Sequence, residues 1–275
     1  MVTGKIKNIF DYHKKYFLIT FAKVFIKITM QNYKITIAYD GTKYNGWQIQ
    51  RDKSVTIQGK ISELLSKLEG KTIEVIGSGR TDSGVHAKQQ TANFVLEHEY
   101  KPSELLNYMN KYLPQDIAIQ TVEKVDERFH ARFSCKSKTY RYRIHISNIP
   151  DVFSRKYVYD YNEKQLDIEL MRKAAAALIG THDFKAFCGN PKFKKSSIRT
   201  ITDITINKTD AEISIDFSGD GFLQNMVRIL TGTLIEVGIK NIPADKIKDI
   251  LLSKDRQQAG FTAPAQGLIL WKTEY

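Results

Sequence analysis

The stretch TIEVIGSGRTDSGVHAKQQTANFVL, residues 72–96, holds two apolar runs with strand-like patterning on either side of a glycine-rich loop. The runs are residues 72–76 and 91–96, and the loop at 77–87 has three glycines within eight positions. Glycine lets the backbone take positive φ and lets a ligand approach the main chain closely. The stretch therefore predicts a β-sheet core whose strands carry a candidate ligand-binding loop.

The segments around this stretch alternate between strand and helix periodicity. In the first half the predicted segments are a strand at 34–39, a helix from Ile57 that stops at Gly70, the two strands above, a helix opened by Pro102 and a strand at 117–125. In the second half they are a strand at 139–146, a helix at 166–179, a hairpin of 200–206 with 212–217, helices at 222–237 and 244–252, and a strand at 268–272. Both halves have the order βαββαβ, and the second has one extra helix.

This repeated order predicts an α+β fold made of two successive ferredoxin-like or RRM-like halves. We expect mixed, mostly antiparallel sheets with helices on one side and a catalytic cleft between the halves. The expected division is an N-terminal extension outside the core at 1–29, a half at 30–133 that carries the loop with Asp82, and a half at 134–275.

The charge balance indicates a polyanionic partner. The 275 residues include 42 Lys and Arg against 30 Asp and Glu, a formal net charge of +12, while 42% of the residues are apolar. A chain with this many apolar residues can bury a hydrophobic core, and this excludes intrinsic disorder. An excess of positive charge says which partners a protein binds and not how it folds. Nucleic acid is the commonest polyanion that such a surface meets.

Residues 1–29 contribute a large part of this charge, with six Lys and one Asp. Their apolar run is interrupted by Lys23 and Lys27, so it predicts neither a membrane span nor a signal peptide. An amphipathic membrane-surface helix and an RNA-binding arm stay as alternatives to a simple appendage. Cys135 and Cys188 lack the spacing of a zinc site or a disulfide framework, which fits a cytoplasmic protein without a metal.

Asp82 is the only carboxylate in the glycine-rich loop. It is either a turn residue that bonds its own backbone or a reactive group. Arg80 lies two positions earlier, and in extended backbone it points to the same side, where it can keep Asp82 ionised or orient an anion. The chain has no P-loop, HExxH or dinucleotide motif. The loop therefore favours covalent or acid–base catalysis by a carboxylate, with His86 as a general base or a structural residue.

Three further segments carry positive charge beside aromatic or apolar residues. Residues 132–143 hold five basic residues with interleaved tyrosines, and residues 192–199 hold four more. They predict contacts with RNA phosphates and bases, although a solvated edge strand and an idle loop are the alternatives. The predicted RNA contacts are Arg132, Lys136, Lys138, Arg141, Lys194 and Lys195. Arg228 is the single cation of an apolar helix, and it either reaches solvent or pairs with a carboxylate such as Asp82.

Six blocks of the chain, in order, resemble the tRNA pseudouridine synthase A (TruA) family. They are residues 40–48, 77–87, 129–134, 138–142, 222–228 and 263–268. The resemblance implies a homodimeric isomerase that makes pseudouridine at positions 38, 39 and 40 of the tRNA anticodon stem-loop without cofactor or metal. It does not extend to residues 1–29.

The resemblance also implies roles for single residues. Asp82 resembles the family's nucleophile, Arg80 its loop arginine and Arg228 the arginine paired with the aspartate. Tyr140 resembles the tyrosine that packs on the target base. Gln89 stands where glycine is usual, which puts the substrate preference in doubt. One competing hypothesis is a non-catalytic RNA-binding protein with two RRM-like units, but this sequence lacks the aromatic RNP pattern that such units need. The other is a carboxylate-dependent nucleoside hydrolase.

Overall fold

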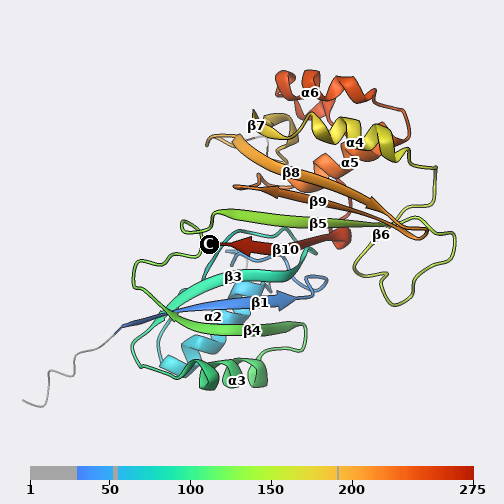
Figure 1. Cartoon of the computed structure of the whole chain (residues 1–275). Coiled ribbons are helices and arrows are strands. Elements are labelled where there is room, and N and C mark those ends of the chain that lie inside the picture. The colour runs from blue at the N-terminus through green and yellow to red at the C-terminus, as the bar shows by residue number, and fades with distance from the viewer. Residues whose placement is uncertain (1–29, 52–54, 191) are drawn as a thin grey trace, which may run out of the picture.

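The computed structural model describes residues 30–51, 55–190 and 192–275. The hypotheses for residues 1–29 lie outside the described residues. The described chain is built around one open sheet with helices packed beside each of its two halves (Figure 1).

Ten strands form this sheet, and eight of them follow one another in the order β4-β1-β3-β10-β5-β9-β8-β7. Their bounds are β1 Gln31–Tyr39, β3 His86–Leu96, β4 Ile117–Val125, β5 Ser137–His145, β7 Gly180–Asp183, β8 Ile198–Lys208, β9 Glu212–Gly219 and β10 Leu268–Glu274. The short strands β2 Ile76–Gly77 and β6 Tyr159–Asp160 pair with β3 and β5. All pairings are antiparallel except those of β10 with β3 and β5 with β6. The predicted α+β class with a mixed, mostly antiparallel sheet is confirmed.

The α-helices lie in two groups along the sheet (Figure 1). Near β1 and β4 are α2 Ile57–Glu69 and α3 Pro102–Tyr112; near β7, β8 and β9 are α4 Ile168–Ala176, α5 Met226–Gly238 and α6 Ile247–Ser253. Short 3₁₀ turns are Phe184–Phe187, Ala244–Lys246, Arg256–Gln258 and Ala265–Gly267. None of the helices in the described ranges is long and apolar enough to cross a membrane.

Local sequence signals explain where the helices begin and end. The Thr56 hydroxyl accepts a hydrogen bond from the amide of Gly59 at the start of α2, and Gly70 ends that helix with φ 71°. Pro102 occupies the first turn of α3, where its missing N–H costs nothing. The helix predicted at 222–237 begins four residues later, since Asn225 takes a left-handed conformation before Met226.

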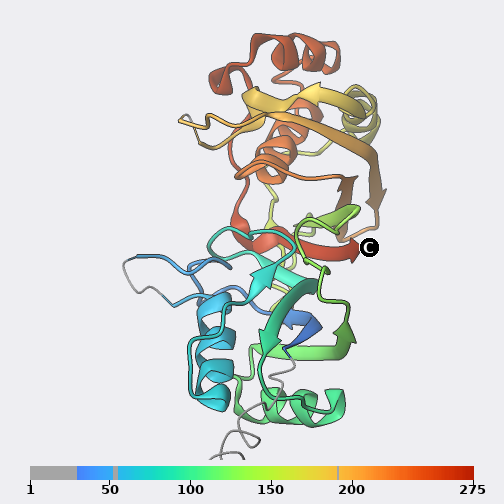
Figure 2. The ribbon, with the colours of Figure 1, turned by 90° about the vertical axis from the view of Figure 1, so that its left-hand side faces the viewer.

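The last strand joins the two halves of the sheet. In β10, Ile269 pairs in parallel with His86 of β3, and Leu268 pairs antiparallel with Tyr142 of β5. Figure 2 shows this strand, in red, between the two groups of helices. The two halves thus share a single hydrogen-bonded sheet, and the second half contains the strands β6 and β7 in addition to the predicted βαββαβ order.

The strand predicted at 72–76 is almost absent, because only Ile76 and Gly77 join the ladder. Ile73 and Val75 are nevertheless buried, whereas Thr72 and Glu74 are exposed. Alternating burial therefore produced the strand-like pattern without strand pairing.

Candidate active site

The loop that carries Asp82 packs tightly against the segment after β1. The amide of Trp47 donates to the carbonyl of Thr81 at 3.1 Å, and the amide of Val85 closes a turn on the carbonyl of Asp82 at 3.1 Å. A Cβ on Gly77 would lie 2.5–2.7 Å from ring atoms of the buried Trp47. The glycine at 77 thus lets the loop approach the indole ring.

Asp82 is partly shielded from water at the tip of this loop. Burial raises the pKa of its carboxyl, while the positive charge of Arg228 and the backbone amide of Asn225 act in the opposite direction. A carboxylate with few water partners is a stronger nucleophile than a solvated one, because less hydration must be lost when it attacks. The arrangement suits a reactive carboxylate.

Arg228 lies in the first turn of α5, close enough to Asp82 to lower the pKa of its carboxyl. Its guanidinium donates from Nε to the carbonyl of Ala263 at 2.7 Å and from Nη1 to Oδ1 of Asn225 at 3.1 Å. Among the described residues, no direct ion pair joins Arg228 to Asp82. The side chain is therefore anchored to neutral acceptors, and its charge acts on the carboxylate from nearby.

Tyr140 lies on β5, directly opposite Leu270 on one side and Phe217 on the other. Its side chain is buried, and its ring meets Phe222 edge-on with 5.2 Å between centroids. Burial raises the pKa of the Tyr140 hydroxyl, and the negative charge of Asp82 adds to that rise. Tyr140, packed against Phe222, thus lies near enough to the carboxylate for the charge of Asp82 to act on it.

Arg80 is exposed, and its Nε donates to Oε1 of Gln48 at 3.1 Å. Gln48 in turn donates to Oε1 of Gln58 at 2.8 Å. Arg228, rather than Arg80, is the guanidinium whose charge acts on the pKa of Asp82. Neither Gln48, the partner of Arg80, nor Gln58, the partner of Gln48, was predicted from the sequence. The only signal for Gln58 was its polar side chain beside Ile57 at the start of an amphipathic helix.

The predicted RNA contacts fall into different surroundings. Lys138 passes over Gly79, with Cε 3.4 Å from the position that a Cβ would take, so it lies beside the loop. Arg141 lies on the opposite face of β5 from Tyr140. It makes a two-pronged ion pair with Asp216, at 2.7 Å for each bond. The remaining predicted contacts are exposed, and they are Arg132, Lys136, Lys194 and Lys195.

His86 occupies a buried position behind the loop. Its Nδ1 accepts a hydrogen bond from the amide of Gly41 at 3.0 Å and lies 3.2 Å from Oδ1 of Asp40. Its ring meets Tyr157 edge-on, and burial lowers the pKa of the imidazole. These contacts favour the structural interpretation of His86 over the general base.

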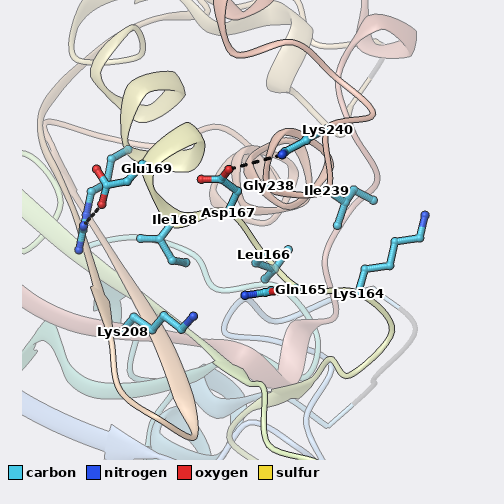
Figure 3. Close-up of a pocket in the computed structure, with 11 residues that line it drawn as sticks. Lys164, Gln165, Leu166, Asp167, Ile168, Glu169, Lys208, Gly238, Ile239 and Lys240 are labelled. Atoms are coloured by element: carbon cyan, nitrogen blue, oxygen red, sulfur yellow. Dashed lines mark hydrogen bonds and ion pairs between the residues drawn. The ribbon is translucent and has the colours of Figure 1, made fainter.

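Two cavities open on the described surface. The first, of about 600 Å³, lies beside the start of α4, and Figure 3 shows the residues that line it. There, Nζ of Lys240 lies 3.9 Å from Oδ2 of Asp167. Another, of about 400 Å³, lies beside Trp271. Asp82 lines neither. Within the described ranges, no group of three or more His, Cys, Asp or Glu side chains is placed to hold a metal ion. The site is thus defined by a shielded carboxylate, an arginine and two aromatic rings.

Comparison with known proteins places this chain in a family. The model of the tRNA pseudouridine synthase family matches residues 35–134 and 174–275. The tRNA pseudouridine synthase A of Acetivibrio thermocellus is 45% identical over 247 residues, which cover 90% of this chain and all of the relative. Its counterpart from Bacillus sp. (strain KSM-64) is 48% identical over 88% of this chain and 98% of the relative. The tRNA pseudouridine synthase A 1 of Clostridium tetani is 47% identical over 90% of this chain and all of the relative.

These matches show that the α+β fold described above is that of an isomerase of the pseudouridine synthase class. The chain belongs to the tRNA pseudouridine synthase family.

Proposed function

We propose that this enzyme isomerises uridine to pseudouridine at positions 38, 39 and 40 of the tRNA anticodon stem-loop, with Asp82 as nucleophile and without a cofactor. The observation that carries the proposal is the placement of Asp82, shielded in its loop beside Arg228 and the ring of Tyr140. The choice of positions rests on the six sequence blocks shared with the tRNA pseudouridine synthase A family.

The reaction is an isomerisation, so every atom of the substrate returns to the product. The bond from N1 of uracil to C1′ of ribose breaks, and a bond from C5 to C1′ forms. C5 loses its proton, and N1 gains one. The Asp82 carboxylate attacks either C1′ or C6, forms a transient covalent bond and leaves again when the new bond closes. No electrons are exchanged with another reagent.

Each neighbour of Asp82 has a role in this scheme. Arg228 keeps the carboxylate ionised despite its burial. Tyr140 and Phe222 hold the detached base, which must first leave its helical stack at a cost of a few kcal/mol. Arg80 is exposed and is oriented by Gln48, and it contacts the RNA that binds at the loop with Asp82.

The rest of the enzyme binds the tRNA. The exposed Arg132, Lys136, Lys194 and Lys195 contact phosphates on both sides of the site. The halves at 30–133 and 134–275 flank the catalytic cleft, with Asp82 contributed by the first and Arg228 by the second. The enzyme acts as a homodimer in the cytoplasm.

Replacement of the carboxylate tests the proposal. Asp82→Asn and Asp82→Ala are assayed on unmodified tRNA transcript, with pseudouridine located by mass spectrometry and tRNA binding measured in parallel. We expect no pseudouridine at positions 38–40 and near-normal binding. Free uridine is the control substrate, and it stays unconverted by the wild-type enzyme. Normal pseudouridine from either variant would contradict the role of Asp82, and product at other positions would contradict the site.

A further inference from the structure

Asn225 stands out in the backbone next to the site. It is the residue before α5 and has φ 58° and ψ 4°, which is the left-handed region. Only two other non-glycine residues of the described chain, Lys240 and Lys254, have positive φ. A left-handed conformation strains an L-residue, and such strain collects at functional sites. The Asn225 side chain does not cap the helix that follows, so another contact accounts for it.

That contact is with Arg228. Oδ1 of Asn225 accepts a hydrogen bond from Nη1 of Arg228 at 3.1 Å, while the carbonyl of Ala263 holds Nε at 2.7 Å. Two acceptors on different nitrogens fix the plane of the guanidinium group. The orientation of the Asn225 amide follows, because only its oxygen can accept from an arginine.

The backbone of Asn225 acts on the other member of the site. Its amide, at the start of α5, stabilises the ionised carboxylate of Asp82. Amides in the first turn of a helix have no partner within the helix, so they are free for an external acceptor. A single residue therefore lies close enough to Asp82 for its main chain to act on the carboxylate, and it bonds Arg228 through its side chain.

Gly189 makes room for this arrangement. A Cβ at Gly189 would lie 2.5 Å from Nδ2 and 2.9 Å from Cβ of Asn225. The amide of Gly189 also donates to the carbonyl of Gln224 at 2.8 Å, which holds the two segments together. Gly189 has no positive φ, so its backbone accepts alanine and only the space beside Asn225 requires glycine.

We propose that Asn225 is a positioning residue that aligns Arg228 with Asp82, and that Gly189 is kept small to seat its side chain. This rests on the proposed role of Asp82 as nucleophile. In its left-handed conformation, Asn225 has its main chain near the carboxylate and its side chain on the guanidinium group.

Asn225→Gly tests the side chain alone, because glycine keeps the left-handed backbone and removes the acceptor for Arg228. On tRNA transcript with enzyme in excess, we expect the single-turnover rate constant to fall by about tenfold or more. The Kd for tRNA should stay within about twofold, since the change misaligns the reacting groups without removing an RNA contact. The melting temperature should stay equal or rise. Lys240→Gly, which relieves a similar left-handed residue at φ 66°, is the control and should leave the rate unchanged.

Gly189→Ala is a second variant that tests the same proposal. Its Cβ displaces the Asn225 side chain, so the rate constant should fall in this variant as well. In the double variant Asn225→Gly with Gly189→Ala, no side chain remains to be displaced. The rate should then equal that of Asn225→Gly alone, which makes the two changes non-additive.

Two results would overturn the inference: an Asn225→Gly enzyme with the wild-type rate constant, or losses that multiply in the double variant. Asp82→Ala, assayed in parallel, separates the two levels of the argument. If Asp82→Ala is inactive and Asn225→Gly is unaffected, the positioning role alone is wrong. If Asp82→Ala keeps the wild-type rate, the proposed function is wrong.

Discussion

Gln58 accepts a hydrogen bond from Nε2 of Gln48 at 2.8 Å, although Gln58 is buried on α2 and Gln48 lies in the segment after β1. Gln58 also donates from Nε2 to the carbonyl of Val75 at 2.7 Å. Because the side-chain nitrogen of Gln58 donates to the carbonyl of Val75, the side-chain oxygen of Gln58 must face Gln48. The oxygen of Gln48 must then face Arg80. A buried glutamine thus sets the direction of an exposed arginine.

Loss of this chain should weaken tRNA binding. Gln48→Met keeps the shape of the side chain and removes the acceptor for Arg80, so the exposed guanidinium loses its orientation. We expect the Kd for tRNA to rise roughly threefold to tenfold, the equivalent of one hydrogen bond of about 1 kcal/mol. Gln50→Met is the matched control, because Gln50 is exposed and bonds only the carbonyl of Asn45 among the described residues. Wild-type affinity in Gln48→Met would show that Arg80 needs no such support.

Asp82 should lower the stability of the fold at neutral pH. Burial raises the pKa of its carboxyl above the ordinary value of 3.8, so the stability that the protonated form provides is present below that value. It is lost as the pH rises through the raised pKa. Asp82→Asn should therefore melt higher than wild type at pH 7, and the difference should vanish near pH 3–4. A gain of 1 kcal/mol corresponds to about 2–4 °C for domains of 150–250 residues.

The control for this pH series is Asp210→Asn, since Asp210 is exposed in the turn between β8 and β9. Its melting temperature should follow wild type at every pH. An Asp82→Asn enzyme that melts below wild type at pH 7 would mean that the carboxylate stabilises the fold, contrary to the direction of its pKa.

Because Gly77 packs directly on Trp47, any larger residue at position 77 should destabilise the fold. Gly77→Ala places a methyl group 2.5–2.7 Å from the indole ring, which is fully buried and has little room to move. We expect unfolding in urea to show a loss of about 1–3 kcal/mol, as for other overpacked cores. Gly79→Ala, in the same loop, meets only the flexible stem of Lys138 at 3.4 Å and should lose much less. Equal losses in the two variants would rule out the indole ring as the cause.

The basic side chains should divide into two groups when binding is measured against salt. Lys194 and Lys195 are exposed, so the double alanine variant should reduce the slope of log Kd against log salt by about 1.5–2, with no change in melting temperature. Arg141 is already paired with Asp216 and covers the ring of Trp271 at 3.9 Å. Arg141→Gln should leave the slope nearly unchanged and lower the melting temperature by a few degrees. A reduced slope in Arg141→Gln would instead assign Arg141 to the RNA surface.

The sequence by itself determined the local elements and the class of chemistry. The helix Ile57–Glu69 and the strand Ile117–Val125 follow from periodicity and from signals such as Gly70, all of which act within a few residues. Asp82 could be singled out for the same reason, because a lone carboxylate among glycines is a local pattern. The excess of positive charge pointed to a polyanion without any knowledge of the fold.

The tertiary structure alone decided which distant residues meet. The strand Leu268–Glu274 lies between β3 and β5, a pairing that local periodicity does not encode. The same holds for the hydrogen bond from Gln48 to Gln58, which orients Arg80. It also holds for Asn225, which bonds Arg228 and lies near Asp82. The surroundings of Arg141 were decided in the same way, since Asp216 of β9 lies opposite it and takes its guanidinium group. Contacts of this kind depend on distances of a few ångström between segments far apart in the chain, and only the folded chain sets those distances.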